Sequence, residues 1–171
     1  MTKLKIVKYS DKKHSILTKK THPIKEITPE IQQLASDMIE TMYSVPGVGL
    51  AANQVGKNLS IIVIDITKEK NSPVVLFNPC VTEKKGRVAF EEGCLSFPGI
   101  NIEIKRPSYV KVNALNSKGK PITLQADGLL SRVLQHEIDH LEGKTMLDRI
   151  PFYKKLKYKL LLKKPKKQQP E

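Results

Sequence analysis

The sequence predicts an α+β fold in which mainly antiparallel β-sheets pack around a central helix that carries a His-Glu-x-x-His motif. Three observations lead to this prediction. Strand-like segments follow one another between residues 59 and 126 without helical periodicity between them, which favours antiparallel pairing over crossover connections. Apolar residues recur at helical spacing before and after that region. The 171 residues are enough for one domain with a sizeable core.

An early helix is predicted to begin after Thr28. Threonine is a good N-terminal cap, Pro29 suits the first helical turn, and Glu30 places negative charge at the positive end of the helix dipole. The apolar residues that would form its buried stripe are Ile31, Leu34, Met38 and Met42.

The middle of the chain is predicted to be strands. The first of them is apolar enough to be buried. The turn at residues 116–119, Asn-Ser-Lys-Gly, joins the last two as a hairpin. The six predicted strands are residues 59–66, 74–81, 86–90, 99–104, 109–116 and 122–126.

A late helix is predicted at about residues 129–141. Asp127 and Gly128 are candidate caps at its start, and Gly143 suits a left-handed cap at its end. One buried stripe is made by Leu130, Leu134, Ile138 and Leu141. A second face is made by Leu129, Val133, His136 and His140. A helix with two such faces is normally interior, so its histidines would lie at the bottom of a pocket.

The motif on this helix is His136, Glu137 and His140. Residues four apart lie on the same face of a helix, so both imidazoles can reach one metal ion. Glu137 projects beside them, where a carboxylate can take a proton from a water molecule at the metal. The alternative is a solvated helix that carries two histidines by chance. Two of the four histidines of the chain flank this glutamate, so a metal site is the favoured interpretation.

A catalytic site of this type needs a third protein ligand. The downstream oxygen candidates are Glu142 and Asp148. Cys94 is the better candidate, because a thiolate binds soft and borderline metals and Gly93 beside it allows close approach. Taken alone, Cys94 would more often be a small buried hydrophobe. Cys80 is predicted to be buried packing, and a chain with only two cysteines argues against a disulfide framework.

A third segment runs from Gly47 to Gln54 with the sequence Gly-Val-Gly-Leu-Ala-Ala-Asn-Gln. Its glycines and small residues allow the backbone to pass close to a ligand. The amide of Gln54 can donate a hydrogen bond to an oxygen. In isolation, a turn that enters the strand at 60–66 explains this segment better.

Together the three segments resemble the peptide deformylase family. Its signatures are a G-x-G-x-A-A-x-Q run, an E-G-C-L-S run and an H-E-x-D-H run. In this sequence they begin at Gly47, Glu92 and His136 and stand in the order of the family. The resemblance extends from about residue 22 to residue 147. It implies an enzyme that hydrolyses the N-formyl group from the initiator methionine of newly made polypeptides and releases formate.

The resemblance also implies roles for individual residues. One divalent metal ion is held by Cys94, His136 and His140, with Glu137 as general acid/base. The amide of Gln54 and the backbone N–H of Leu95 bind the oxyanion. The native metal is expected to be Fe(II), although Cys-His-His donors also accept Zn, Ni or Co in purified protein. The residues expected to contact substrate are Phe90, Leu129 and Val133 around the methionine side chain, and Val48, Gly49 and Gly93 along the peptide backbone.

Two positions depart from better-known members of the family. Pro46 stands where an acidic residue is frequent, and Asn101 stands where a substrate-facing arginine can occur. Neither would touch the metal chemistry. Both bear on how the enzyme treats residues after methionine.

Charge is concentrated at the C-terminal end. The net charge is +13 at pH 7, and eight of the lysines follow Pro151. We expect residues 1–171 to form a single catalytic domain that ends in a basic amphipathic helix and tail at about 151–171. This helix would dock by an apolar stripe of Phe152, Leu156 and Leu160. Because lysine clusters bind phosphate backbones, the tail is expected to contact the ribosome.

The beginning of the chain has no secretory hydrophobic region, and no run approaches the roughly 18 apolar residues of a membrane span. We therefore expect a cytoplasmic protein with no membrane partner. Two other classes would share some of these features. A zinc endoprotease would use the same motif but should need a downstream ligand. A non-catalytic RNA-binding protein would use the basic tail and a structural metal.

Overall fold

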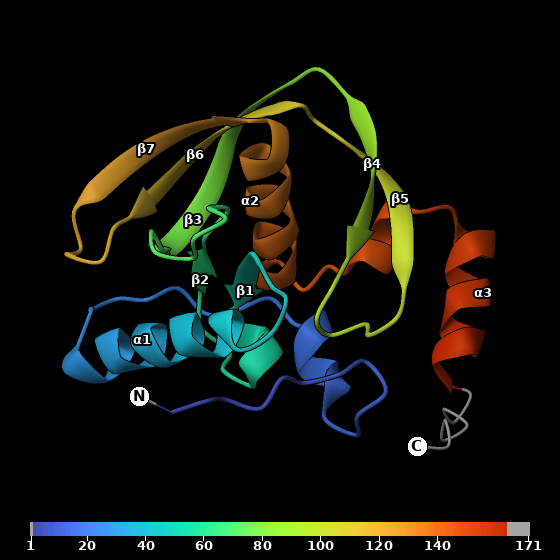
Figure 1. Cartoon of the computed structure of the whole chain (residues 1–171), viewed down its shortest axis with the longest axis horizontal. Helices are drawn as coiled ribbons and strands as arrows, with labels where there is room; N and C mark the ends of the chain where they lie inside the picture. Colours follow the sequence, from blue (N-terminus) through green and yellow to red (C-terminus); the bar gives the residue numbers. More distant parts are fainter. Residues whose placement is uncertain (1, 164–171) are drawn as a thin grey trace.

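The two sheets of the structure are antiparallel, as the sequence predicts. The computed structural model describes residues 2–163 and, within them, holds a five-stranded sheet, a two-stranded sheet and three α-helices (Figure 1). The elements in chain order are η1 (His14–Thr18), α1 (Pro29–Tyr43), β1 (Gly49–Ala51), η2 (Ala52–Val55), β2 (Ile61–Ile64), β3 (Val74–Lys85), β4 (Val88–Gly93), β5 (Asn101–Arg106), β6 (Tyr109–Leu115), β7 (Pro121–Asp127), α2 (Gly128–Leu141), η3 (Met146–Arg149) and α3 (Phe152–Lys163).

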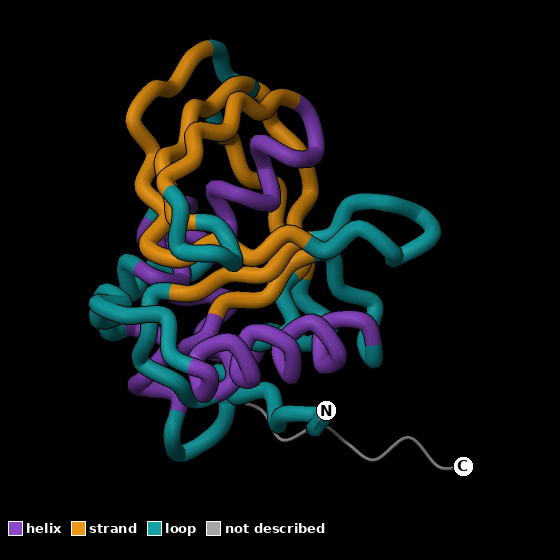
Figure 2. The backbone as a smooth tube through the Cα atoms, turned by 90° about the vertical axis from the view of Figure 1, so that its left-hand side faces the viewer, coloured by secondary structure: helices purple, strands orange, loops and turns teal. Residues whose placement is uncertain are grey.

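The five-stranded sheet has the order β1-β2-β3-β6-β7, and β4 pairs with β5 in the second sheet. Strand β2 alternates between its two faces, as period-two geometry requires. Ile61 and Val63 belong to one buried cluster, with α1, whereas Ile62 and Ile64 belong to another, with α2. The two helices therefore cover opposite faces of this sheet, which Figure 2 shows from the side.

Helix α1 begins as predicted. The Thr28 side chain accepts a hydrogen bond from the Ile31 N–H, and Pro29 lies at the first helical position. Met38 and Met42 are fully buried, and Ile31 and Leu34 are packed partly buried against the same cluster. The predicted stripe of this helix is therefore confirmed.

Helix α2 is the central element, and every one of its residues from Ser131 to Leu141 is buried. Leu134, Ile138 and Leu141 contact the core of the five-stranded sheet, and the β4–β5 pair lies on the other side of the helix in Figure 1. Gly143 has a left-handed φ of 69°, as predicted for the C-terminal end. Asp127 occupies the predicted cap position at the start of the helix, but its side chain makes no capping hydrogen bond.

Helix α3 presents a different face from the one predicted. Phe152, Leu156 and Leu160 are 79%, 50% and 57% exposed, while Tyr158 and Leu162 pack with η3 and β5 in a third cluster. The prediction that Phe152, Leu156 and Leu160 dock the helix is therefore wrong. Residues 164–171 of the predicted tail lie outside the described residues.

Cys80 is also corrected, since its side chain is exposed rather than buried. It lies on β3 next to one of the irregularities in the β3–β6 register, between Phe77 and Cys80. Such an irregularity changes which side chains face the core. Among residues 2–163, no helix is long and apolar enough to cross a membrane.

Candidate active site

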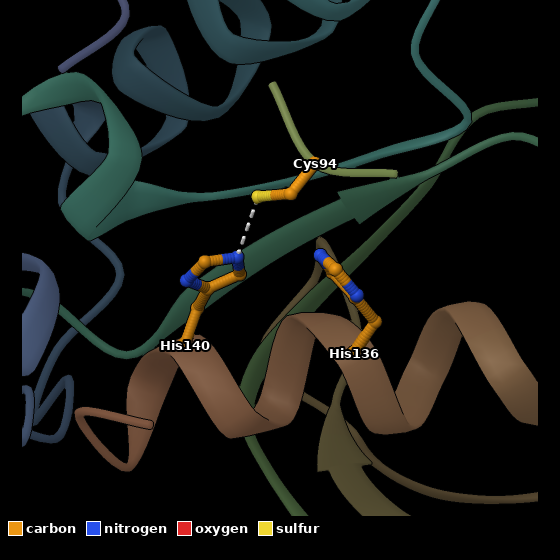
Figure 3. Close-up of side chains that lie close together, drawn as sticks. All are labelled: Cys94, His136 and His140. Atoms are coloured by element: carbon orange, nitrogen blue, oxygen red, sulfur yellow. Dashed lines mark hydrogen bonds between the residues drawn. The ribbon is translucent and has the colours of Figure 1, made fainter. Parts of the chain in front are cut away.

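The two motif histidines project from the same face of α2. Their ring centroids lie 5.0 Å apart, and both side chains are buried, His140 at 1% exposure. Figure 3 shows both imidazoles turned toward the thiol of Cys94. The i, i+4 spacing of His136 and His140 therefore produces the shared face that the sequence predicts.

Cys94 comes from the turn that follows β4. The Phe97 N–H donates to the Cys94 carbonyl oxygen over 2.9 Å, which closes the turn. Its Sγ lies 3.3 Å from Nε2 of His140. Cys94, His136 and His140 each offer one possible ligand atom, and these three atoms all lie within 4.8 Å of one another.

This donor set fits a single metal ion. A sulfur and two imidazole nitrogens are suitable for zinc and for soft or borderline transition metals. Nδ1 of His136 lies 3.0 Å from Oε2 of Glu92. Because the carboxylate accepts, Nδ1 carries the proton and the lone pair of Nε2 is left for a ligand bond, as in metal sites generally.

Glu92 is the centre of a buried ion-pair network. It accepts hydrogen bonds from Arg106 at 2.6 and 3.0 Å and from Arg132 at 2.5 Å. Arg106 also donates to Asp139 at 2.7 Å, and Arg149 donates to the same carboxylate. The network joins β4, β5, α2 and η3, and it fixes the ring of His136 through Glu92.

The charges of the network shift the pKa values around the site. Burial alone would raise the pKa of Glu92, but hydrogen bonds from His136 and Arg106 lower it to about 2. Burial would also lower the pKa of His136, yet hydrogen bonds to Cys94 and Glu92 raise it well above its ordinary value. Burial and the positive charge of His136 lower the pKa of His140. The groups around His136 therefore favour a positive charge at this position, which either a proton or a metal cation on Nε2 would supply.

Glu137 lies beside the ligand cluster, and its side chain is buried. Its Oε2 has no hydrogen-bond partner within residues 2–163. Burial raises the pKa of Glu137 to about 7, against the opposing positive charge of His136 and Arg106. A carboxyl group with a pKa near neutrality can both take up and release a proton at working pH.

The side-chain amide of Gln54 has a fixed orientation. Its Oε1 accepts a hydrogen bond from the Ala51 N–H over 2.9 Å. The amide nitrogen therefore points the other way, 3.5 Å from Sγ of Cys94 and 3.3 Å from Oγ of Ser96. A donor that faces the ligand cluster in a side chain only 1% exposed is suited to an anionic oxygen.

A cavity of about 640 Å³ opens onto these residues. Phe90, Leu129 and Val48 line it although they are 60%, 50% and 41% exposed. Large apolar side chains exposed within a concave site are typical of ligand binding. The sequence-predicted residues that line the same cavity are Val48, Gly49, Gln54, Phe90, Gly93, Cys94, Leu95, Leu129, Val133, His136 and Glu137.

Comparison with known proteins decides the family. The sequence pattern described as Polypeptide deformylase matches residues 3–156, most of the chain. The chain belongs to the polypeptide deformylase family. Among curated relatives, the peptide deformylase of Aquifex aeolicus is 45% identical over 88% of this chain and 93% of its own length. That of Neisseria gonorrhoeae is 42% identical over 98% of both chains.

Solved structures of this deformylase family share the fold. A peptide deformylase from Legionella pneumophila superposes with a TM-score of 0.87, at 38% identity over 94% of both chains. The peptide deformylase from Ehrlichia chaffeensis in complex with actinonin superposes with a TM-score of 0.88, at 33% identity over 95% of this chain and 97% of that one. The chain is thus a metal-dependent hydrolase that removes the N-formyl group from the initiator methionine of new polypeptides and releases formate.

The sequence prediction missed most of the residues that support this deformylase site. No sequence pattern indicates a role for Arg106 or Asp139, and Glu92 stands out only as the first residue of a signature run. A usable signal existed for Arg106, because it continues the inward alternation of Ile102 and Ile104 on β5. An arginine at an inward position requires a buried acid as partner.

Proposed function

We propose that the chain carries out deformylation at one metal ion held by Cys94, His136 and His140, with Glu137 as general acid/base. The observation that carries this proposal is the cluster of three ligand atoms within 4.8 Å beside a buried carboxylate. The assignment agrees with the family to which the chain belongs. It also uses the free Nε2 that the contact with Glu92 leaves on His136.

When bound, the metal acidifies a water molecule and polarises the formyl oxygen. Glu137 accepts the proton of the attacking water. It then delivers that proton to the departing amine, as its raised pKa of about 7 favours. The burial of Glu137 excludes bulk water from these proton transfers, and the hydrogen bond from His136 to Glu92 holds the imidazole in place.

The amide nitrogen of Gln54 and the backbone N–H of Leu95 stabilise the negative charge on the formyl oxygen. The orientation of the Gln54 amide supports this role. Leu95 follows Cys94 directly, and its N–H has no protein acceptor within the described part of the chain. The loss of one such donor typically lowers kcat by about a hundredfold or more.

The cavity accounts for substrate selection. We assign Phe90, Leu129 and Val133 to the methionine side chain, because they bring apolar surface to the cavity wall. The peptide backbone pairs with Val48, Gly49 and Gly93 as an added strand. Strand β1 supplies part of this edge, and a peptide strand beside it would gain backbone hydrogen bonds.

The native ion is proposed to be Fe(II), with Zn, Ni or Co able to occupy the same donors in purified protein. We further propose that residues 1–171 act as a single catalytic domain in the cytoplasm. The lysines of α3 and of the chain after it are proposed to bind the ribosome, where formylated chains emerge. The basic charge of this segment supports that contact.

The test of this assignment compares two variants on a formyl-Met peptide. Glu137→Gln keeps the shape of the side chain but removes its proton transfer, so we expect full metal content and a kcat lowered by about a hundredfold or more. Cys94→Ala should lose metal and activity together after dialysis, because two histidines bind a divalent ion weakly. Formate release and metal content by mass spectrometry are the measurements.

Two results would contradict the assignment. One is near-normal turnover by Glu137→Gln. The other is a Cys94→Ala protein that keeps its metal and cleaves internal bonds of unformylated peptides, which would favour an endoprotease.

A further inference from the structure

One wall of the cavity comes from a segment near the start of the chain, residues 5–9, which is far in sequence from the motifs. The Val7 N–H donates to the carbonyl oxygen of Gln54 over 2.7 Å, and the Tyr9 N–H donates to that of Ser96 over 2.8 Å. These two bonds hold the segment beside Gln54 and beside Ser96, the residue that follows Leu95.

The side chains of this segment alternate as in an extended strand. Tyr9 does not line the cavity and stacks on Phe97, with ring centroids 4.8 Å apart. Ile6 and Lys8 both line the cavity. The backbone of Lys8 is held further by its N–H, which donates to Oδ2 of Asp11 over 2.8 Å. The backbone of Lys8 is thus held at the cavity wall by these contacts.

Lys8 differs from the other cation of the cavity. Arg132 is buried, and its guanidinium donates to Glu92 and to the carbonyl oxygens of Ile104 and Val88. Lys8 is exposed and has no carboxylate within 4.0 Å of its ammonium group among residues 2–163. Its charge is therefore available to a bound peptide.

The lining of the cavity also carries negative charge. Glu91 lines the cavity from β4 and stands directly across the strand pair from Glu103. Neither carboxylate has a cation within 4.0 Å in the described part of the chain. Asn101, which also lines the cavity, is neutral. The described cavity lining thus offers a bound peptide both a lysine and a glutamate that have no ion-pair partner within 4.0 Å.

We propose that Lys8 is a specificity-determining residue that favours an acidic side chain at one of the two positions after formylmethionine. The inference rests on the proposed binding of the peptide in this cavity. Successive side chains of an extended peptide face opposite walls, so only one of the two positions should respond to Lys8. An exposed ion pair of this kind changes kcat/KM by about two- to fivefold.

The experiment uses peptides of the form formyl-Met-X-Ala-amide and formyl-Met-Ala-X-amide, where X is Glu, Gln or Lys. The amide removes the terminal carboxylate, which would otherwise compete for Lys8. Wild type, Lys8→Gln and Lys8→Glu are compared with the metal-loaded enzyme at low salt. Lys5→Gln is the matched control, because Lys5 is an exposed lysine of the same segment that does not line the cavity.

The quantity measured is the ratio of kcat/KM for the Glu peptide to that for the Lys peptide. We expect a ratio above one at a single position in wild type, a fall of about two- to fivefold in Lys8→Gln, and a reversal in Lys8→Glu. Added salt should reduce the wild-type ratio, and Lys5→Gln should keep it.

The peptide with Gln tests the proposed function separately, since it carries no charge at X. Equal ratios in wild type and Lys8→Gln, with normal turnover of the Gln peptide, would overturn the role of Lys8 alone. The same fall in Lys5→Gln would also overturn it, because the effect would then come from the overall charge. No turnover of any of the peptides by wild type would remove both the proposed function and this inference.

Discussion

At the scale of single residues, the site depends on how closely the backbone of β1 approaches Glu137. A Cβ added to Gly49 would lie 2.6 Å from Oε1 of Glu137 and 2.9 Å from Cγ1 of Val133. Ordinary Cβ contacts do not occur at such distances. A glycine is therefore required here so that the backbone can pass the carboxylate.

We predict that Gly49→Ala displaces Glu137 without removing the metal. Catalytic groups misplaced by about 1 Å can lose roughly a hundredfold in rate, so kcat on a formyl-Met peptide should fall by about that factor. Metal content after dialysis should stay at the wild-type level, since the ligands are on other segments. A variant with wild-type kcat would show that β1 moves freely away from Glu137.

The sequence allowed the ligands to be predicted better than the residues that support them. His136 and His140 are four apart on one helix, so their geometry is local. The contact of Glu92 with Arg106 joins two strands, and that of Arg106 with Asp139 joins a strand to α2. Such contacts depend on how the elements pack, and a single sequence records the residues without the pairing.

At the scale of elements, α2 is anchored to its neighbours by charge as well as by apolar packing. Arg106 of β5 is 2% exposed and bridges Glu92 and Asp139. Arg149 of η3 reaches the same Asp139, but 36% of its side chain is exposed. A buried charge that loses its partner costs far more free energy than an exposed one.

We predict that the two arginines differ in their effect on stability. Arg106→Leu should lower the free energy of unfolding by roughly 3 kcal/mol or more, because two buried carboxylates lose a shared partner. Arg149→Leu should cost about 1 kcal/mol, since solvent screens its pair. Urea denaturation of metal-free protein makes the comparison without a contribution from ion binding. Equal losses of unfolding free energy in the two variants would mean that the burial of Arg106 does not increase its contribution to stability.

Prediction of the elements succeeded where burial and periodicity coincide. Strand β3 was predicted at residues 74–81, but it extends to Lys85 because its polar end pairs with β6 while exposed to solvent. Strand β1 was missed because three residues in a glycine-rich run have no detectable period. In α3 two apolar stripes exist, and the sequence does not say which of them meets the third cluster.

At the scale of the whole molecule, the net charge is +13, and α3 contributes lysines to it while also exposing the apolar side chains of Phe152, Leu156 and Leu160. Figure 1 places α3 at one end of the molecule and the β6–β7 hairpin at the other. Because Phe152, Leu156 and Leu160 do not cover the core, the outer surface of α3 can be changed without loss of buried packing. The ribosome proposal can therefore be tested by substitution instead of truncation.

We predict that Lys154→Gln with Lys157→Gln weakens binding to purified ribosomes. Both lysines are exposed on α3, and each lost phosphate contact should reduce the slope of log K against log salt by a little under one, so by roughly 1.5–2 for the pair. Turnover of a short formyl-Met peptide measures the active site in the same variant. Lys118→Gln with Lys120→Gln makes the same charge change on the distant hairpin and should keep more of the binding. Equal weakening by both pairs would mean that net charge alone attracts the protein, and no weakening by the α3 pair would leave α3 as a solvated helix.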